Sequence, residues 1–216
     1  MNPSKFAQTK VAAAQRLHPA VFALALLTGL ALVLSFPSLS RGAETPEWTV
    51  DPVHSTVAFS IQHIAAPVSG RFNDFEGTIA FDPDHPEQGH ISVEIKTASV
   101  DTGNEQRDTH LKSPDFFDSA AHPLMTFTSS DIRPVGGDSY VAKGPLTIRG
   151  VTEEIELNFV FNGIKPHPMQ EGKQVAGFEA GTVIDRLQFN VGDGRFFKGG
   201  MIGKEVKITI FIEALR

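Results

Sequence analysis

Apolar and polar residues alternate with a period of two along most of the chain after residue 50. The positions that share one face of these runs are Val57, Phe59, Ile61 and His63; Phe75, Ile79 and Phe81; Ile91, Val93 and Ile95; Tyr140, Leu146 and Ile148; Ile155, Leu157, Phe159 and Phe161; and Val206, Ile208, Ile210 and Ile212. Such alternation is typical of antiparallel strands with one buried face. Turns rich in Pro, Gly and Asn separate the runs, as in Asp82 to Gly89. The pattern predicts about eight antiparallel strands.

One segment, from Thr97 to Pro123, lacks this alternation. Asp101 and Thr102 are both candidate helix caps, and Asn104 to Lys112 is compatible with about two helical turns. We therefore predict an all-β fold with one short helical insertion. A meander of about eight strands closes most readily as a barrel, because closure removes exposed edges, and a barrel of that size holds one small ligand.

The first 42 residues have a different character. Three basic residues and no acid precede an apolar run from Ala20 to Phe36, which Pro37 and small residues follow. This order is typical of a secretory signal peptide, and cleavage after Ser40 or after Gly42 fits equally. An uncleaved membrane anchor is the alternative, because the run approaches the roughly 20 residues that span a bilayer. We expect an exported domain over residues 43–216.

Charge and composition narrow the class of partner. Four of the 19 basic residues and none of the 25 acidic ones precede residue 43, which leaves 15 basic against 25 acidic residues, a formal charge of −10. Such a surface repels phosphate backbones, so we expect no nucleic-acid partner. The chain has no cysteine, so burial of apolar surface must hold the exported fold together. Its 17 phenylalanines against one Trp and one Tyr fit an ordinary core or a dry interior with room for an apolar ligand.

Several ordered motifs carry a resemblance to a known family. They are WTVDPVHSTVAFSIQHI (48–64), VSGRFNDFEGTIAFD (68–82), VDTGNEQRDTHLKSPDFFD (100–118), HPLMTFTSS (122–130) and GPLTIRGVTEEIEL (144–157). This series resembles the YceI-like, polyisoprenoid-binding family of bacterial periplasmic proteins. The resemblance implies a lipocalin-like antiparallel barrel, often a dimer, whose long apolar pocket holds isoprenoid or similar amphiphilic chains. Residues 43–216 would then form a periplasmic lipid-binding domain, anchored to the membrane if the signal is not cleaved.

The stretch from Arg186 onward departs from the family pattern. The family usually carries Arg-x-x-Phe-Gly here, whereas this chain reads RLQFN and continues as VGDGRFFKGGMIG. Asn190 can still adopt a turn conformation with positive φ. The additional Phe196 and Phe197 are able to reshape one mouth of the pocket, and we place Arg186 among the supporting residues.

Histidines on the first strand have different expected roles. His63 shares parity with Phe59, so a regular strand turns it to the apolar side. There it is either a hydrogen-bonded core histidine or a donor to the head group of a ligand. His54 has the opposite parity, and with Asp51 and Ser55 it is expected to organise the entry to the strand.

The predicted helix carries the densest polar cluster, Arg107, Asp108 and His110. These residues either hold the insertion onto the barrel or place Arg107 and His110 at the pocket mouth, where a guanidinium binds phosphate or carboxylate with two parallel hydrogen bonds. Asp108 is then expected to orient Arg107 or His110. Phe116 and Phe117 would cover an apolar tail, so the segment is interpreted as a lid.

Together these arguments give one candidate site without catalytic residues. The predicted ligand-binding residues are His63, Arg107, His110, Phe59, Leu111, Phe116, Phe117, Phe127 and Phe159, supported by Asp51, His54, Asp108 and Arg186. No metal is expected, because no short His-x-His or His-x₃-His pair occurs, and no cofactor is expected beyond the bound lipid.

The favoured function is a non-enzymatic carrier or sequestering protein for isoprenoid-type lipids or other long-chain amphiphiles. A membrane enters only as the source or acceptor of the lipid, and a homodimer is the assembly that the resemblance suggests. One alternative is a periplasmic hydrolase of lipophilic esters with His63 or His110 as a base near Asp108, although no serine lies in a recognisable nucleophile elbow. The other is a structural or stress-response protein whose own side chains fill the pocket.

Overall fold

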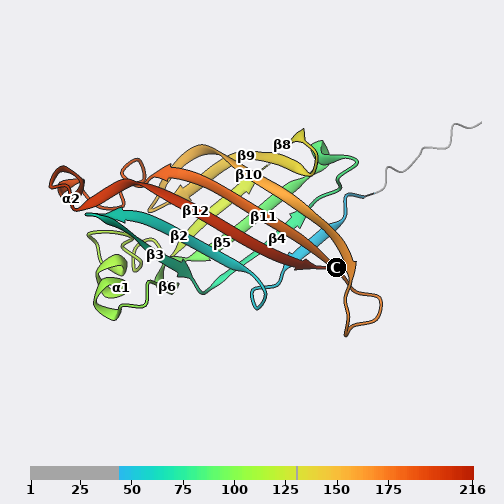
Figure 1. Ribbon diagram of the computed structural model, residues 1–216, viewed down its shortest axis with the longest axis horizontal. Helices are drawn as coiled ribbons and strands as arrows, with labels where there is room; N and C mark the ends of the chain where they lie inside the picture. The colour runs from blue at the N-terminus through green and yellow to red at the C-terminus, as the bar shows by residue number, and fades with distance from the viewer. Residues whose placement is uncertain (1–43, 130) are drawn as a thin grey trace, which may run out of the picture. The chain divides into compact units, whose positions relative to one another are not determined.

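The computed structural model describes residues 44–129 and 131–216, and the segment predicted as a signal peptide, residues 1–42, lies outside them (Figure 1). Within the described residues the chain is almost entirely β-structure. The strands are β1 (Glu47–Val50), β2 (Thr56–His63), β3 (Ala66–Phe72), β4 (Phe75–Ala80), β5 (His90–Lys96), β6 (Val100–Asp101), β7 (Leu124–Ser129), β8 (Asp131–Gly136), β9 (Ser139–Ile148), β10 (Val151–Pro166), β11 (Gln174–Asp185) and β12 (Ile202–Leu215). The helical pieces are α1 (Glu105–Lys112), α2 (Arg195–Lys198) and two 3₁₀ turns, η1 (Pro86–Gln88) and η2 (Thr97–Ser99).

Eight of these strands close into an antiparallel barrel. Their order is β1-β4-β5-β7-β9-β10-β11-β12, and β12 returns to β1 with Val50 opposite Ala214. The N-terminal part of β12 also pairs with β2, which continues the same sheet through β3 to β6, and β8 pairs with β9. The predicted all-β barrel with about eight strands is therefore confirmed, and β2, β3, β6 and β8 are additional strands outside the closed circuit.

The alternation in the sequence sorts side chains between the inside and the outside of this barrel. On β10, Leu157 and Phe159 are buried whereas the intervening Glu156 and Asn158 are exposed. On β12, Phe211 faces outward and is 46% exposed. Because each barrel strand presents alternate residues to the interior, about half of its side chains form a continuous apolar lining.

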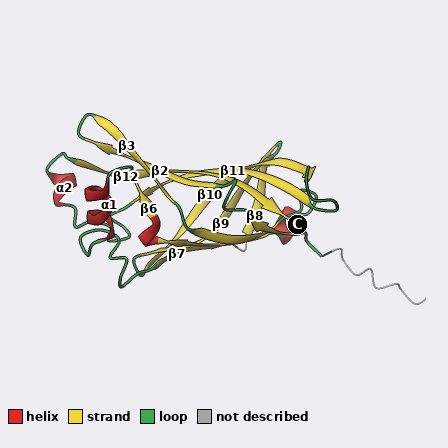
Figure 2. Cartoon of the chain, turned by 90° about the horizontal axis from the view of Figure 1, so that it is seen from below, coloured by secondary structure: helices red, strands yellow, loops and turns green. Residues whose placement is uncertain are grey.

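An aromatic cluster fills one end of the barrel. The ring of Phe81 packs edge-on against Tyr140, Phe159, Phe161 and Phe178, with centroid distances of 4.9 to 5.9 Å. Beside them the fully buried Trp48 donates its indole N–H to the carbonyl oxygen of Phe81 at 3.4 Å. Packed side chains therefore fill the interior at this end, and α1 and α2 lie together at the opposite end (Figure 2).

The predicted helix is present as α1, but its cap differs from expectation. The side chain of Asn104 accepts a hydrogen bond from the backbone N–H of Arg107 at 3.0 Å and caps the helix. The candidate caps Asp101 and Thr102 are wrong: Asp101 instead accepts from the N–H of Gly103 and closes the preceding turn. Asn, like Asp and Thr, is a favourable cap, so the sequence alone did not choose among the three neighbours.

The short helix α2 was not predicted. It lies in the stretch that departs from the family pattern, where Gly194 has φ 82° and Asp193 accepts a hydrogen bond from the N–H of Arg195. Four residues are too few to show a helical period, so this turn leaves no pattern in the sequence. None of the helices in the described ranges is long and apolar enough to cross a membrane.

Candidate functional site

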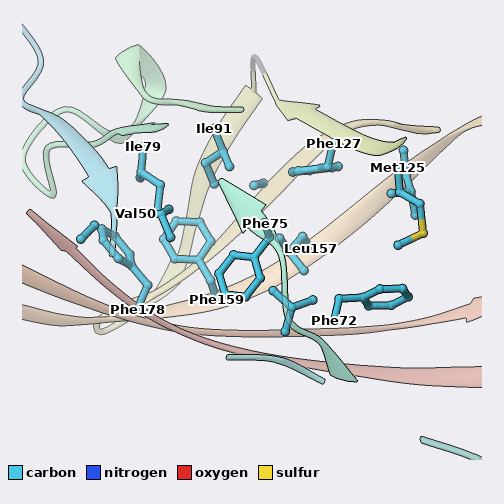
Figure 3. Close-up of a cluster of buried hydrophobic side chains, with 14 of the residues drawn as sticks. Val50, Phe72, Phe75, Ile79, Ile91, Met125, Phe127, Leu157, Phe159 and Phe178 are labelled. Atoms are coloured by element: carbon cyan, nitrogen blue, oxygen red, sulfur yellow. The ribbon is translucent and has the colours of Figure 1, made fainter. Parts of the chain in front are cut away.

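An apolar cavity of about 690 Å³ occupies the barrel between the aromatic cluster and the α1 end. This volume lies within the range of roughly 300–1,000 Å³ that is usual for small-ligand pockets. Phe72 and Met125 line it toward one side and Phe178 toward the other, and Phe75 and Phe159 lie between them (Figure 3). The walls are almost entirely hydrocarbon, so the space favours an apolar occupant.

The cavity also explains why several side chains that point into the barrel are only partly buried. Ile208, Ile210 and Ile212 of β12 point into the barrel, yet they are only partly buried, and all three line the cavity. Phe59 of β2 behaves in the same way. In a barrel filled by its own side chains these positions would be closed off by their neighbours across the interior.

Segments around α1 and α2 cover the cavity at the end opposite the aromatic cluster. Phe116 stacks on Phe196 of α2, with ring centroids 6.0 Å apart, and the imidazole of His110 meets Phe116 edge-on at 4.9 Å. Phe117 packs edge-on against Phe72 of β3 at 5.7 Å. The segment from α1 to Phe117 thus lies at this end of the cavity, with α2 as a second part of the cover. That the segment acts as a lid over a ligand remains a prediction.

The polar residues of α1 are organised around Thr102. Arg107 donates from Nε to the Thr102 hydroxyl at 2.7 Å and from Nη2 to the Thr102 carbonyl at 2.8 Å. Asp108 accepts from the backbone N–H and from the hydroxyl of Thr102. The Thr102 hydroxyl stands between Asp108 and Arg107 and links the two side chains. That Asp108 orients Arg107 for a ligand remains a prediction.

His110 belongs to a second polar network, which joins the two parts of the cover. Its Nε2 lies 3.2 Å from Oδ2 of Asp115, and Arg195 of α2 donates to the other carboxylate oxygen at 3.2 Å. Arg195 also pairs with Asp193 at 2.9 Å. All these groups are about half exposed or more, so each pair alone adds little to stability. Their effect is to fix the position of α2 against the end of α1.

His63 lies at the end of β2, at the cavity mouth, and is exposed. The interpretation as a core histidine is therefore wrong, because the strand ends at this residue and its side chain reaches the rim instead of the interior. Within residues 44–129 and 131–216 the His63 ring takes part in no hydrogen bond or ion pair, which leaves it available to a ligand at the rim.

Asp51 and His54 form a separate local structure outside the cavity. Nδ1 of His54 lies 2.7 Å from Oδ2 of Asp51, whose other oxygen accepts from the N–H of Val53 at 2.9 Å. The hydrogen bond to Asp51 raises the pKa of His54, and the same bond lowers the pKa of Asp51. Ser55 exchanges two hydrogen bonds with the backbone of Glu213. This cluster organises the break between β1 and β2, as the sequence suggested.

Arg186 differs from the other arginines because its side chain is only 4% exposed. It follows β11, lines the cavity, and donates from Nε to the carbonyl of Gly203 at 2.9 Å and from Nη1 to the carbonyl of Val191 at 2.6 Å. Burial away from water lowers the pKa of this guanidinium. Among the described residues, Nη2 has no hydrogen-bond partner.

The structure thus brings together all nine residues predicted to bind a ligand. His63, Arg107, His110, Phe59, Leu111, Phe116, Phe117, Phe127 and Phe159 line the one cavity, and so does Arg186. Asp51, His54 and Asp108 do not line it. That these side chains contact a ligand remains a prediction.

Sequence reasoning missed several residues of the site. They are Thr102, Asp115, Phe72, Phe178, Phe189 and Val191 in its polar network and wall. Strand parity could have identified Phe178, because it shares a face with Ala180 and Ile184 on β11. No periodic signal marks Thr102 or Asp115, which lie in turns. In the described part of the chain no group of three His, Cys, Asp or Glu side chains is placed to hold a metal ion.

A closed eight-strand barrel around an apolar cavity, with a polar and aromatic cover at one end, defines a class of barrel that can enclose a single apolar ligand. Residues 48–214 match the family model described as YceI-like domain. The chain belongs to the YceI-like family. A UPF0312 protein of Pectobacterium atrosepticum is 36% identical over 164 residues, which cover 76% of this chain and 82% of that protein.

Solved structures give the same assignment of the fold. The crystal structure of BcnA from Burkholderia cenocepacia is 30% identical, matches with a TM-score of 0.69 and covers 76% of this chain and 99% of its own. A protein described as a polyisoprenoid binding domain from Saccharophagus degradans is 16% identical, with a TM-score of 0.59, and covers 80% of this chain and 98% of its own. At 16% identity the second match supports the fold and nothing further.

Proposed function

We propose that this protein binds and carries, or sequesters, an isoprenoid-type lipid or another long-chain amphiphile in the bacterial periplasm, without catalysing a reaction. The observation that carries the proposal is the cavity of about 690 Å³, whose wall is built from the inward faces of the barrel strands. The choice of an isoprenoid as ligand follows, by analogy of fold only, the polyisoprenoid-binding description of the Saccharophagus degradans domain.

The free energy available to such a ligand is large. Burial of one CH₂ group contributes roughly 0.8 kcal/mol, so a five-carbon isoprene unit contributes up to about 4 kcal/mol before the costs of binding. A few units therefore suffice for useful affinity without any charged contact. The polar residues at the mouth would select the head group and its orientation.

The arrangement around the histidines favours binding over hydrolysis. Neither the His63 ring nor the His110 ring is hydrogen-bonded to a serine or threonine hydroxyl within the described ranges, and His110 is engaged by Asp115. A hydrolase of the serine type needs the nucleophile and its base within hydrogen-bond reach. The cavity residues therefore form an apolar binding space in which no hydroxyl nucleophile is paired with a histidine base.

Native mass spectrometry of the exported protein, followed by organic extraction, tests the proposal. We expect a co-purifying long-chain lipid, and we expect its loss in Phe117→Asp, because a carboxylate on the cover opposes the burial of a hydrocarbon tail. Phe211→Asp on the outer face of β12 is the matched control and should keep the lipid. Recovery of the wild type with no lipid, together with no uptake of added farnesol, would contradict the proposal.

Two further measurements address the alternatives. Turnover of a panel of lipophilic esters by the wild type, lost in His63→Ala, would establish the hydrolase. N-terminal sequencing of the protein from the periplasmic fraction tests the location: a new terminus after Ser40 or Gly42 supports export with cleavage, and an intact Met1 indicates an anchor.

A further inference from the structure

The guanidinium of Arg186 is a buried cation without an ion-pairing partner, although the charges of Asp185 and Asp193 act on it from beyond ion-pairing distance. No carboxylate in the described part of the chain lies within ion-pairing distance of it, and its two hydrogen bonds go to the neutral carbonyl groups of Gly203 and Val191. Its Nη2 has neither a hydrogen-bond partner nor contact with solvent. Buried charges in proteins are normally paired, and a buried donor left without an acceptor costs about 1–3 kcal/mol, more when it is charged. The protein alone does not complete this site.

The surroundings of Arg186 hold the side chain in place. The segment after β11 folds back over its own arginine, because the N–H groups of Phe189 and Val191 both donate to the Arg186 carbonyl. Gly192 lies so close that a Cβ atom there would approach Nη1 to 2.4 Å, and its φ of 84° also favours glycine. The guanidinium is therefore seated in a fixed position, which is the condition for selective binding of a planar or tetrahedral oxyanion.

Arg186 also lies where a ligand in the cavity can reach it. It is part of the cavity wall, and a Cβ atom built on Gly192 would lie 3.5 Å from the ring of Phe116 as well as close to the guanidinium. The arginine is thus next to the cover, at the end of the cavity away from the aromatic cluster. Arg107, by contrast, lies on the exposed α1, where two of its nitrogen atoms already donate to Thr102.

We propose that Arg186 is the head-group site of this cavity: its guanidinium binds the carboxylate or phosphate oxygens of an anionic amphiphile, whose head lies beneath Phe116 and whose tail extends toward the aromatic cluster. This inference rests on the proposed function and names the class of ligand. The head group supplies a counter-charge in direct contact with the guanidinium. Anionic amphiphiles are therefore preferred over alcohols with the same tail.

A purely structural role for Arg186 makes a different prediction. If the side chain served only to tie the Val191 segment to the start of β12, its removal would lower stability and weaken every ligand equally. A head-group site instead sets the ratio of affinities between ligands that share a tail. The ratio is therefore the informative measurement.

The experiment uses the exported protein stripped of lipid on a hydrophobic resin. Affinities are measured for farnesyl phosphate against farnesol and for hexadecanoate against hexadecan-1-ol. In the wild type we expect each anion to bind roughly 10- to 100-fold more tightly than its alcohol. In Arg186→Gln that ratio should fall to within about threefold of unity while alcohol binding changes little. Arg133→Gln, which removes an exposed arginine paired with Glu156 outside the cavity, is the matched control and should keep the wild-type ratio.

Each remaining outcome has a defined meaning. Farnesol binding without any preference for the anions in the wild type overturns the Arg186 site and leaves the carrier function standing, whereas no uptake of any of the four ligands overturns both. A ratio that survives in Arg186→Gln but is lost in Arg107→Gln places the head group at the outer rim and also overturns the proposal. Inorganic phosphate without a tail should not displace farnesyl phosphate; displacement at similar concentrations would mean a site for free phosphate.

A measurement on the wild type covers the case in which Arg186→Gln does not fold. The ³¹P resonance of bound farnesyl phosphate follows the second ionisation of the phosphate, whose pKa is ordinarily about 6. Beside a buried guanidinium the dianion is stabilised, so the pKa of the bound phosphate should be lower than that of the free ligand. An unchanged or raised value would place the phosphate away from Arg186.

Discussion

Phe116 and Phe196 stack almost face to face, with ring centroids 6.0 Å apart and ring planes inclined by 14°. Phe116 follows α1, whereas Phe196 belongs to α2, in the stretch that departs from the family pattern. His110 meets the edge of Phe116, and the Asp115 carboxylate joins His110 to Arg195. The two separate segments therefore form one cover over the mouth of the cavity.

Phe196→Ala should speed the release of a bound ligand. Loss of the stacked ring removes an aromatic contact worth about 0.5–1.5 kcal/mol, which corresponds to a dissociation rate roughly 2- to 10-fold higher if the cover must open for release. Stopped-flow displacement of a fluorescent fatty acid measures this rate directly.

Phe197→Ala is the control for that experiment. Phe197 is the next residue of α2, yet it is 44% exposed and outside the stack. Its truncation should leave the release rate unchanged. Equal acceleration by both variants would show that helix propensity in α2, and not the stack on Phe116, controls release.

Ala180→Phe should shorten the cavity. Ala180 lies on β11, between Phe159 of β10 and Ile210 of β12, and lines the cavity near the aromatic cluster. A benzyl group there occupies space that the tail of a ligand would fill. The longest alkyl chain that binds should become shorter, while the melting temperature of the lipid-free protein should rise, because filling a cavity is stabilising.

Isothermal titration with saturated fatty acids of increasing length and thermal melts of the lipid-free protein measure the two effects. Glu179→Ala, one residue earlier and on the outer face, should change neither. A variant that binds the full range of chain lengths would mean that tails do not extend to the aromatic cluster.

Ile64 occupies an unfavourable backbone conformation. It lies in the turn between β2 and β3 with φ 48°, and its side chain is 66% exposed. The left-handed conformation costs L-residues about 1–2 kcal/mol, and a β-branched residue is among the least suited to it. Ile64→Asn should therefore raise the free energy of unfolding by about 1 kcal/mol, whereas Ile64→Val should have little effect. Chemical denaturation of both variants tests this, and equal stabilities would contradict the strain argument.

The strands and their inner faces were predictable because the signal is local and periodic. Every position on the predicted inner face of β10 and β12, such as Leu157 and Ile208, lies in the cavity wall or the core. The cover was less predictable, because its contacts join segments that are distant in the sequence. Arg149 illustrates this: it has φ 50° in the tight turn between β9 and β10, and its guanidinium donates to the carbonyls of Pro114 and Asn190.

Arg149 stands where a turn of this kind favours Asn or Gly. Its side-chain contacts tie the turn to both loops of the mouth, which offsets the backbone cost. Asn190, expected to tolerate positive φ, has φ 56°. Tertiary contacts of this sort select a residue against its local preference, so pattern and propensity alone cannot reveal them.

The His54–Asp51 pair should make stability depend on pH in a specific direction. The pKa of His54 is raised by its hydrogen bond to Asp51. A group whose pKa is raised by folding stabilises the folded protein fully at pH values below its pKa in the unfolded chain, which is about 6.5 for histidine. This contribution is lost as the pH rises through the pKa in the folded protein. The pKa of Asp51 is lowered, so its contribution is present above the unfolded value and is lost only as the pH falls through the lowered value.

The pair therefore stabilises most between these two limits, and His54→Ala should lower the melting temperature more at pH about 5.5 than at pH about 9. Lys96→Ala is the matched control. The hydrogen bond to Asp74 raises the pKa of Lys96 from an already basic value, so the Lys96–Asp74 ion pair is intact at both pH values. Lys96→Ala should therefore lower the melting temperature by the same amount at both. Melting curves of the wild type and both variants at the two pH values give the comparison. A His54→Ala deficit as large at the higher pH would show that the imidazole acts through packing or as a neutral hydrogen-bond donor, and not through its charge.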